Sequence, residues 1–186
     1  MKFRILSALL VLGSLSACSQ PLDSPESTYF RMDSRVAQDW ALRDGDVTEV
    51  EYQTAVDGFL SCMAHAGYNA SEPALSPVDG LTLLFDVEPS GDPNVWNTKV
   101  EECNLTHISD IEPAYVEANT QVMDARLREV AVKCLEEKGV ALTGVEQNVT
   151  ELVKSAEGSM QMVMGCVGPA LRTLYPDLPT TLKVRW

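Results

Sequence analysis

The chain has 186 residues, of which 45% are apolar and 22% are charged, a composition that allows one packed domain or two small ones. Its 27 acidic and 14 basic side chains give a formal net charge of −13. Nucleic acids and anionic lipid headgroups are bound by basic patches, so this balance argues against both as partners.

The first residues have the order of parts that is typical of a secretory signal peptide. Lys2 and Arg4 form a basic start, and an apolar run from Ile5 to Leu15 follows. This run is too short for a transmembrane helix, which needs about 20 apolar residues. Small residues then precede Cys18, and cleavage with simple secretion is one interpretation of them.

Leu15-Ser16-Ala17-Cys18 resembles the lipobox of bacterial lipoproteins. The resemblance implies that residues 1–17 are removed and that Cys18 becomes the first residue. It also implies that Cys18 carries a diacylglyceryl group with fatty acyl chains such as palmitate. More than one acyl chain is needed for stable anchoring. We therefore expect a protein tethered through Cys18 to the extracytoplasmic face of the bacterial cell membrane.

The mature chain would have 169 residues, with 12 basic and 27 acidic side chains. Ser19 to Glu26 is polar, contains two prolines and lacks periodicity, so we expect a flexible tether over residues 18–33. The rest divides into a first helical unit over 34–118 and a second helical unit with a tail over 119–186.

The first unit begins with a short helix expected around Ser34–Leu42 and a turn at 44–46. Thr48 and Glu51 have the spacing of a capping box, which predicts the start of an amphipathic helix. Gly67 stands where a left-handed residue ends such a helix.

The prolines at 73, 77 and 89 exclude a helix from the next stretch. Asp79-Gly80 predicts a two-residue turn, which would join a weak strand at 74–78 to a strand over Leu81–Val87. A short helix is expected over Asn94–Cys103, and another one beginning near Glu112.

In the second unit the clearest helix is predicted over Asn119–Lys138, closed by Gly139. Thr143 and Glu146 repeat the capping-box spacing, and an amphipathic pattern follows from Val145 to Ala156. Gly158 interrupts this pattern before a short apolar segment over Met160–Cys166. Three prolines, at 169, 176 and 179, predict an irregular tail, and Leu182–Trp186 has the pattern of a strand.

Four cysteines follow Cys18, and an even count in an exported protein predicts two disulfides. Four cysteines allow three pairings. Cys62 and Cys134 each precede a glycine and an apolar residue by the same spacing, and Val100 and Val163 each precede a second cysteine by three residues. The simplest interpretation is a duplicated unit, which pairs Cys62 with Cys103 and Cys134 with Cys166; a chance match is the alternative.

Glu51 to Tyr68 follows the pattern E-Y-x-x-A-V-x₅-C-x₄-G-Y. This helix resembles one that recurs in small lipoproteins of high-GC Gram-positive bacteria, and the resemblance extends over about residues 44–168 as a pattern of cysteines and helices. The group has no agreed biochemical activity, so the resemblance implies no catalytic residue.

Two groups of residues suggest metal chemistry. Cys62, His65, Cys103 and His107 form a Cys₂His₂ set, but their spacing differs from that of common zinc modules, and exported cysteines usually oxidise. The methionines at 160, 162 and 164 with Cys166 are soft ligands that suit Cu(I), but methionine also fills irregular cores. We therefore expect disulfides and core packing, with no metal or other cofactor.

The motifs of common enzyme classes are absent from the sequence, namely G-x-S-x-G, H-E-x-x-H, a phosphate-binding loop and a dinucleotide fingerprint. We therefore expect a mainly α-helical lipoprotein with a small β-hairpin and two disulfide-linked units. Its expected function is a non-catalytic interaction module of the cell envelope, with an envelope protein as partner. The alternatives are a small-ligand or metal-binding lipoprotein and an envelope enzyme with an unrecognised site.

Overall fold

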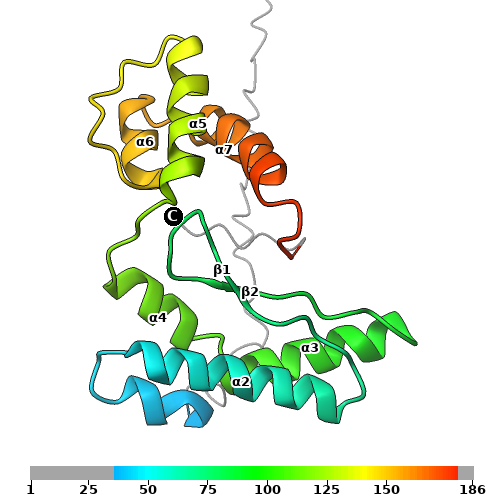
Figure 1. Ribbon diagram of the computed structural model, residues 1–186. Coiled ribbons are helices and arrows are strands. Elements are labelled where there is room, and N and C mark those ends of the chain that lie inside the picture. The colour runs from blue at the N-terminus through cyan, green and yellow to red at the C-terminus, as the bar shows by residue number, and fades with distance from the viewer. Residues whose placement is uncertain (1–35, 180–186) are drawn as a thin grey trace, which may run out of the picture.

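The structure is a computed structural model that describes residues 36–179 (Figure 1). The described part is mainly helical with one two-stranded hairpin, which confirms the predicted fold class. The signal peptide, the tether and the predicted strand at Leu182–Trp186 lie outside the described residues. The elements in chain order are a helix at 36–42, α2 (Glu49–His65), β1 (Ala74–Leu75), β2 (Leu83–Leu84), α3 (Pro93–His107), α4 (Ile111–Ala118), α5 (Ala125–Glu137), α6 (Val149–Ser155) and α7 (Met160–Leu174).

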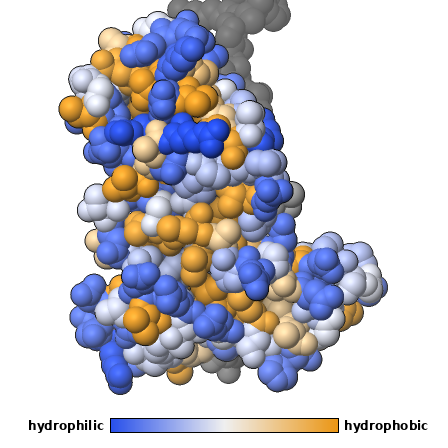
Figure 2. Space-filling view, in the orientation of Figure 1, coloured by the Kyte–Doolittle hydropathy of each residue, from blue (hydrophilic) through white to orange (hydrophobic). Residues whose placement is uncertain are grey.

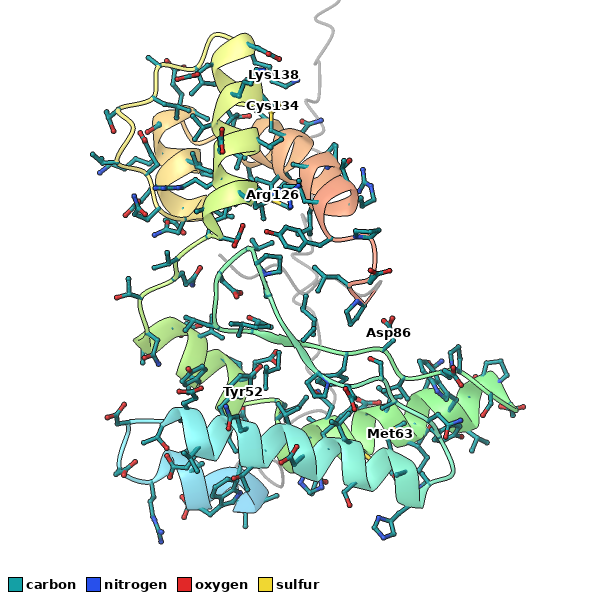
Figure 3. All side chains as sticks on the ribbon, in the orientation of Figure 1. Tyr52, Met63, Asp86, Arg126, Cys134 and Lys138 are labelled. Atoms are coloured by element: carbon teal, nitrogen blue, oxygen red, sulfur yellow. A yellow bond between two sulfur atoms is a disulfide. The ribbon has the colours of Figure 1, made fainter. Side chains whose placement is uncertain are left out.

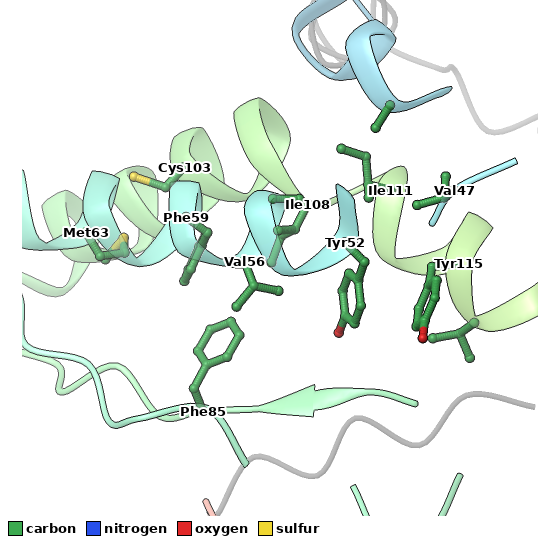
Figure 4. Packing of buried hydrophobic residues seen from close by; sticks show 13 residues of the cluster. Val47, Tyr52, Val56, Phe59, Met63, Phe85, Cys103, Ile108, Ile111 and Tyr115 are labelled. Carbon is green, nitrogen blue, oxygen red and sulfur yellow. The ribbon is translucent and has the colours of Figure 1, made fainter. Parts of the chain in front are cut away.

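The first unit is built on α2, which packs against α3 and α4 and lies beside the hairpin (Figure 1). Thr48 and Glu51 form the predicted capping box, so the helix starts where the sequence indicates. Figure 4 shows the apolar face of α2 directed toward Phe85, whose ring centroid lies 5.3 Å from that of Phe59. The buried core of this unit comprises Ala41, Val47, Tyr52, Ala55, Val56, Phe59, Met63, Phe85, Cys103, Ile108, Ile111, Tyr115 and Val116.

The second unit packs α5 and α6 against α7. Its core is a separate cluster whose buried members are Val78, Met123, Leu127, Ala131, Leu135, Val149, Leu152, Ala156, Val163, Cys166, Val167, Ala170 and Leu171. Val78 belongs to the hairpin loop of the first unit, and it is only 4% exposed. The predicted boundary at 118/119 therefore separates the two sets of helices. The core of the second unit nevertheless includes Val78, because the hairpin loop reaches it.

The hairpin differs from the predicted two-residue turn. Ala74 pairs with Leu84 and Leu75 with Leu83, so the connecting loop covers residues 76–82. The carboxylate of the buried Asp79 accepts hydrogen bonds from the amides of Leu81 and Thr82, and from the hydroxyl of Thr82. The hydrogen bonds of the Asp79 carboxylate thus stabilise a longer loop in place of the predicted two-residue turn.

The helix predicted over Asn119–Lys138 starts later, at Ala125, so this prediction was wrong at its beginning. The backbone amides of Val122, Met123 and Asp124 instead donate to carbonyl oxygens of residues 79, 147 and 77, respectively. Asp124 then caps α5 by accepting from the amides at 126 and 127. Hydrogen bonds to distant segments therefore override the local helical pattern.

The second predicted capping box was also wrong, because α6 begins at Val149 with Asn148 as its cap. Val145 lies outside the helix and is 71% exposed. The carboxylate of the buried Glu146 accepts from the amide and hydroxyl of Thr143, as in a capping box, but no helix follows directly. The same pair of residues stabilises a loop here.

Two helices are longer than predicted. The helix expected over Asn94–Cys103 runs from Pro93 to His107 as α3, with Asp92 as its cap. The segment expected over Met160–Cys166 continues as α7 through Pro169 to Leu174. Proline removes the hydrogen bond to the carbonyl four residues earlier, here that of Gly165. Pro169 and Gly165 are both exposed, so water can satisfy that carbonyl and the helix tolerates the proline.

Candidate functional site

The two disulfides have the predicted pairing. Cys62 is bonded to Cys103 and joins α2 to α3, with 5.8 Å between the Cα atoms. Cys134 is bonded to Cys166 and joins α5 to α7, with 5.7 Å between the Cα atoms. Cys18, the predicted lipidation site, lies outside the described residues.

The helices that carry the first cysteine of each pair end in the same way. The amide of Tyr68 donates to the carbonyl of Met63, and the amide of Val140 donates to the carbonyl of Leu135. The glycines before them, at 67 and 139, have φ of +87° and +84°, the left-handed conformation of a Schellman motif. The local repeat predicted from the sequence is therefore present, while a common origin of the two units stays a prediction.

The candidate Cys₂His₂ set is not arranged as a metal site. Both of its cysteines are in a disulfide, and the Nδ1 atom of His65 lies 2.7 Å from the carbonyl oxygen of Ser61 on its own helix. His107 instead packs against Gly58 of α2, where burial lowers the pKa of its imidazole. The part of the chain between residues 36 and 179 contains no group of three or more side chains arranged to hold a metal ion.

The methionines of α7 are separated by their positions on the helix. Met160 and Met164 pack against the second core, whereas Met162 is 37% exposed. Cys166 is bonded to Cys134. These contacts fit the core-packing interpretation of Met160 and Met164.

A buried polar contact at the centre of the first unit was not predicted. The hydroxyl of Tyr52 donates to the carboxylate of Glu112 at 3.0 Å and accepts from the amide of Leu83 at 2.9 Å. Figure 3 shows Tyr52 on the side of α2 nearest α4. Burial, together with the Glu112 charge, raises the pKa of the Tyr52 hydroxyl. Because both side chains are only 1% exposed, this contact serves to join α2, α4 and the hairpin.

A second buried polar contact fixes the helix at 36–42. Gln38 is 0% exposed, and its amide nitrogen donates to the carbonyl of Leu105 and the hydroxyl of Ser109. Its amide oxygen accepts from the backbone amides of Asp110 and Ile111, at 3.0 and 3.1 Å. One side chain therefore holds the first described helix against the junction of α3 and α4.

This junction forms one wall of an open depression of about 460 Å³ between the helix at 36–42 and α4, which we call the acidic groove. Its apolar lining consists of Leu42, Pro113 and Ala114, and its polar lining consists of three carboxylates. These belong to Asp39, Asp110 and Glu117, and among residues 36–179 no basic side chain lines the groove. Sequence reasoning missed the site because its two walls are about 70 residues apart.

A depression of the same volume, about 460 Å³, lies on the second unit. We call it the mixed groove, because Arg128 and Lys133 line it together with Glu129, Glu136 and Glu146. The buried Glu146 carboxylate accepts hydrogen bonds from Thr143, Gly144 and Ser155. These bonds, chiefly that from the Thr143 amide, lower the pKa of Glu146 to about 2. Each groove lies within one unit.

The net charge of the protein is concentrated in the first unit. Residues 36–118 contain 16 acidic side chains and two basic ones, of which Lys99 is paired with Glu102. Residues 119–179 contain eight acidic and six basic side chains. Figure 2 shows hydrophilic residues over much of both units and apolar ones along the waist between them. The protein therefore has a strongly negative unit joined to one with nearly balanced charge.

Comparisons with known proteins returned no match, either to a family model, to a curated protein or to a solved structure. Over residues 36–179, no helix has the length and apolar character needed to cross a membrane.

Proposed function

We propose that this protein is a lipid-anchored extracytoplasmic lipoprotein that acts as a non-catalytic interaction module of the bacterial cell envelope. The lipobox-like sequence before Cys18 supports the anchor and the location. The two disulfides support export, because such bonds persist in oxidising compartments.

The observation that carries the interaction role is the uneven distribution of charge. A unit with 16 acidic and two basic side chains generates a negative potential that attracts and orients a cationic partner. The second unit, with its near balance of charges, lacks this attraction. In the proposed function the first unit faces the partner.

Exposed apolar side chains accompany the charge on the first unit, whereas those on the second unit, such as Val145, lack the same excess of charge. Val36 on the helix at 36–42 is 76% exposed, and Val50 on α2 is 71% exposed. A surface that combines charge with scattered apolar groups provides both steering and contact area for a protein partner.

Site-specific photo-crosslinking in intact cells tests the proposed function. A photoreactive amino acid is placed at Val36 or Val50 in the first unit, and at Val145 in the second. Val50 and Val145 are matched because both are 71% exposed. We expect a discrete crosslinked adduct from the first-unit positions, with a yield that falls at high salt, and no adduct from Val145. Absence of adducts at both first-unit positions would contradict the proposed orientation.

A further inference from the structure

We propose that residues 182–186 add as a third strand, antiparallel to β1, along the exposed edge of the hairpin at Leu75. The sequence predicts a strand over residues 182–186, which follow the described part of the chain. The inference goes beyond the proposed function, because it concerns a contact within the chain and depends neither on the lipid anchor nor on a partner protein.

The register of the hairpin directs the backbone of Leu75 outward. The amide of Ser76 donates to the carbonyl of Thr82, which makes the neighbouring pair, Leu75 and Leu83, one without hydrogen bonds between its two residues. The backbone N–H and C=O groups of Leu75 therefore point away from β2. On the opposite edge the amide of Leu83 is already used, because it donates to the hydroxyl of Tyr52.

The outward backbone groups of Leu75 have no such partner among residues 36–179. The side chain of Leu75 is also 57% exposed, although it is apolar. An open strand edge with an exposed apolar side chain is a template for pairing with another strand, and natural proteins often cover or block it. Leu75 therefore marks the place on the hairpin where a further strand would pair.

The segment after α7 leads the chain to this edge. The hydroxyl of Tyr175 donates to the carboxylate of Asp124, and the amide of Asp124 donates to the carbonyl of Pro77, just beyond β1. Leu178 packs against the second core, to which Val78 of the hairpin loop also belongs. Figure 1 shows this segment running from the second unit toward the hairpin. The last described residues therefore lie near the end of β1.

The length and the direction of the chain suit the pairing. The seven residues 180–186 can extend over about 23–25 Å, whereas Leu75 is about 7 Å along the strand from Pro77. A chain that starts near Pro77 and continues toward Leu75 runs opposite to β1. The new pair of strands would therefore be antiparallel.

The side chains of the segment also match the edge. Apolar and basic residues alternate in it, as Leu182, Lys183, Val184, Arg185 and Trp186. A strand with this alternation has one apolar face and one basic face. The apolar face can cover the side chain of Leu75. The two positive charges suit the first unit, because residues 36–118 carry 16 acidic and only two basic side chains.

Amide hydrogen exchange followed by NMR tests the pairing in the mature chain, held in an uncharged detergent. The variant is Lys183→Pro/Val184→Pro. Adjacent residues of a strand direct their amides to opposite sides, so one of the two prolines must remove a bond to β1. Lys183→Thr/Val184→Thr is the matched control, because it removes the same charge but keeps side chains that favour strands. The amide of Ser76, which bonds within the hairpin, reports whether the hairpin is intact.

We expect the Leu75 amide to exchange at least about tenfold more slowly in the wild type and the threonine variant than in the proline variant, because a hydrogen bond between strands protects an amide until the edge opens. The Ser76 amide should exchange equally in all three proteins. Equal exchange of the Leu75 amide in the wild type and the proline variant would overturn the proposal.

Photo-crosslinking identifies what occupies the edge, and it decides the matter if the proline variant alters both amides. A photoreactive amino acid replaces Leu75 or, as the matched control, Val95 on α3, which is 56% exposed. We expect mass spectrometry to find position 75 attached to residues 182–186 of the same chain, and position 95 attached to none of them. Adducts of twice the chain mass would assign the edge to a second copy and overturn the proposal, as would the lack of any link from position 75 to residues 182–186.

Discussion

The carbonyl oxygen of Asp79 accepts a hydrogen bond from the backbone amide of Val122 at 2.9 Å. Asp79 lies in the hairpin loop of the first unit, and Val122 lies in the segment that leads to α5. The carbonyl oxygen of Val122 lies 2.9 Å from the position that a Cβ atom at Gly80 would occupy. The hairpin loop of the first unit therefore lies so close to the segment before α5 that only glycine fits at position 80. The two units are joined by this contact as well as by the connecting chain.

Replacement of Gly80 by alanine should destabilise the protein through this contact. Gly80 has φ of +68°, so alanine costs about 1–2 kcal/mol for the left-handed backbone. The clash with Val122 adds about 1–3 kcal/mol. Gly91→Ala is the matched control, because Gly91 has φ of +73° and open space around it. Urea unfolding measures the loss in free energy of unfolding for both variants. Equal losses would contradict the close contact between Gly80 and Val122.

Peptide mapping without reduction should yield one linked pair containing Cys62 and Cys103, and another containing Cys134 and Cys166. The disulfides close loops of 41 and 32 residues, and the chain-entropy model gives about 4 kcal/mol for each. Cys62→Ala/Cys103→Ala and Cys134→Ala/Cys166→Ala should therefore lower the free energy of unfolding by similar amounts. A linked peptide containing Cys62 and Cys134 would refute the pairing.

Glu146 should make stability depend on acid pH. The pKa of Glu146 is lowered from 4.5 to about 2 in the folded protein. The ionised carboxylate therefore stabilises the fold at pH values above the pKa that Glu146 has in the unfolded chain. This contribution should disappear as the pH falls from about 5 toward 2. Glu146→Gln should lose about 1–3 kcal/mol at pH 7, because the amide nitrogen cannot accept the hydrogen bonds, and should flatten this pH dependence. Glu136→Gln, at an exposed site on α5, should retain it; parallel pH profiles for wild type and Glu146→Gln would contradict the assignment.

Cys18→Ala should prevent lipid attachment and remove the protein from the membrane fraction, or leave it with its signal peptide. Fractionation followed by mass spectrometry of the N-terminus measures both outcomes. Ser16→Ala, which keeps a small residue before Cys18, serves as the control and should remain anchored. Wild-type protein found wholly in the medium with an unmodified N-terminus would rule out the lipoprotein assignment.

The amino-acid sequence by itself determined the features that depend on neighbours within a few residues. The capping box of Thr48 and Glu51 starts α2, and the left-handed glycines at 67 and 139 end α2 and α5. The local repeat around the cysteines also predicted the two disulfides. These predictions succeeded because a helix end is specified by hydrogen bonds between residues three to five positions apart.

Only the tertiary structure decided where local patterns are overridden. Residues 122–124 have a helical pattern, but their amides bond to segments around residues 77–79 and 147 instead. The acidic groove is likewise a product of folding, because Gln38 draws Asp39 beside Pro113 and Glu117 from about 75 residues away. Such contacts depend on which distant segments the packed cores bring together. The periodicity of apolar residues along the chain does not indicate which segments these are.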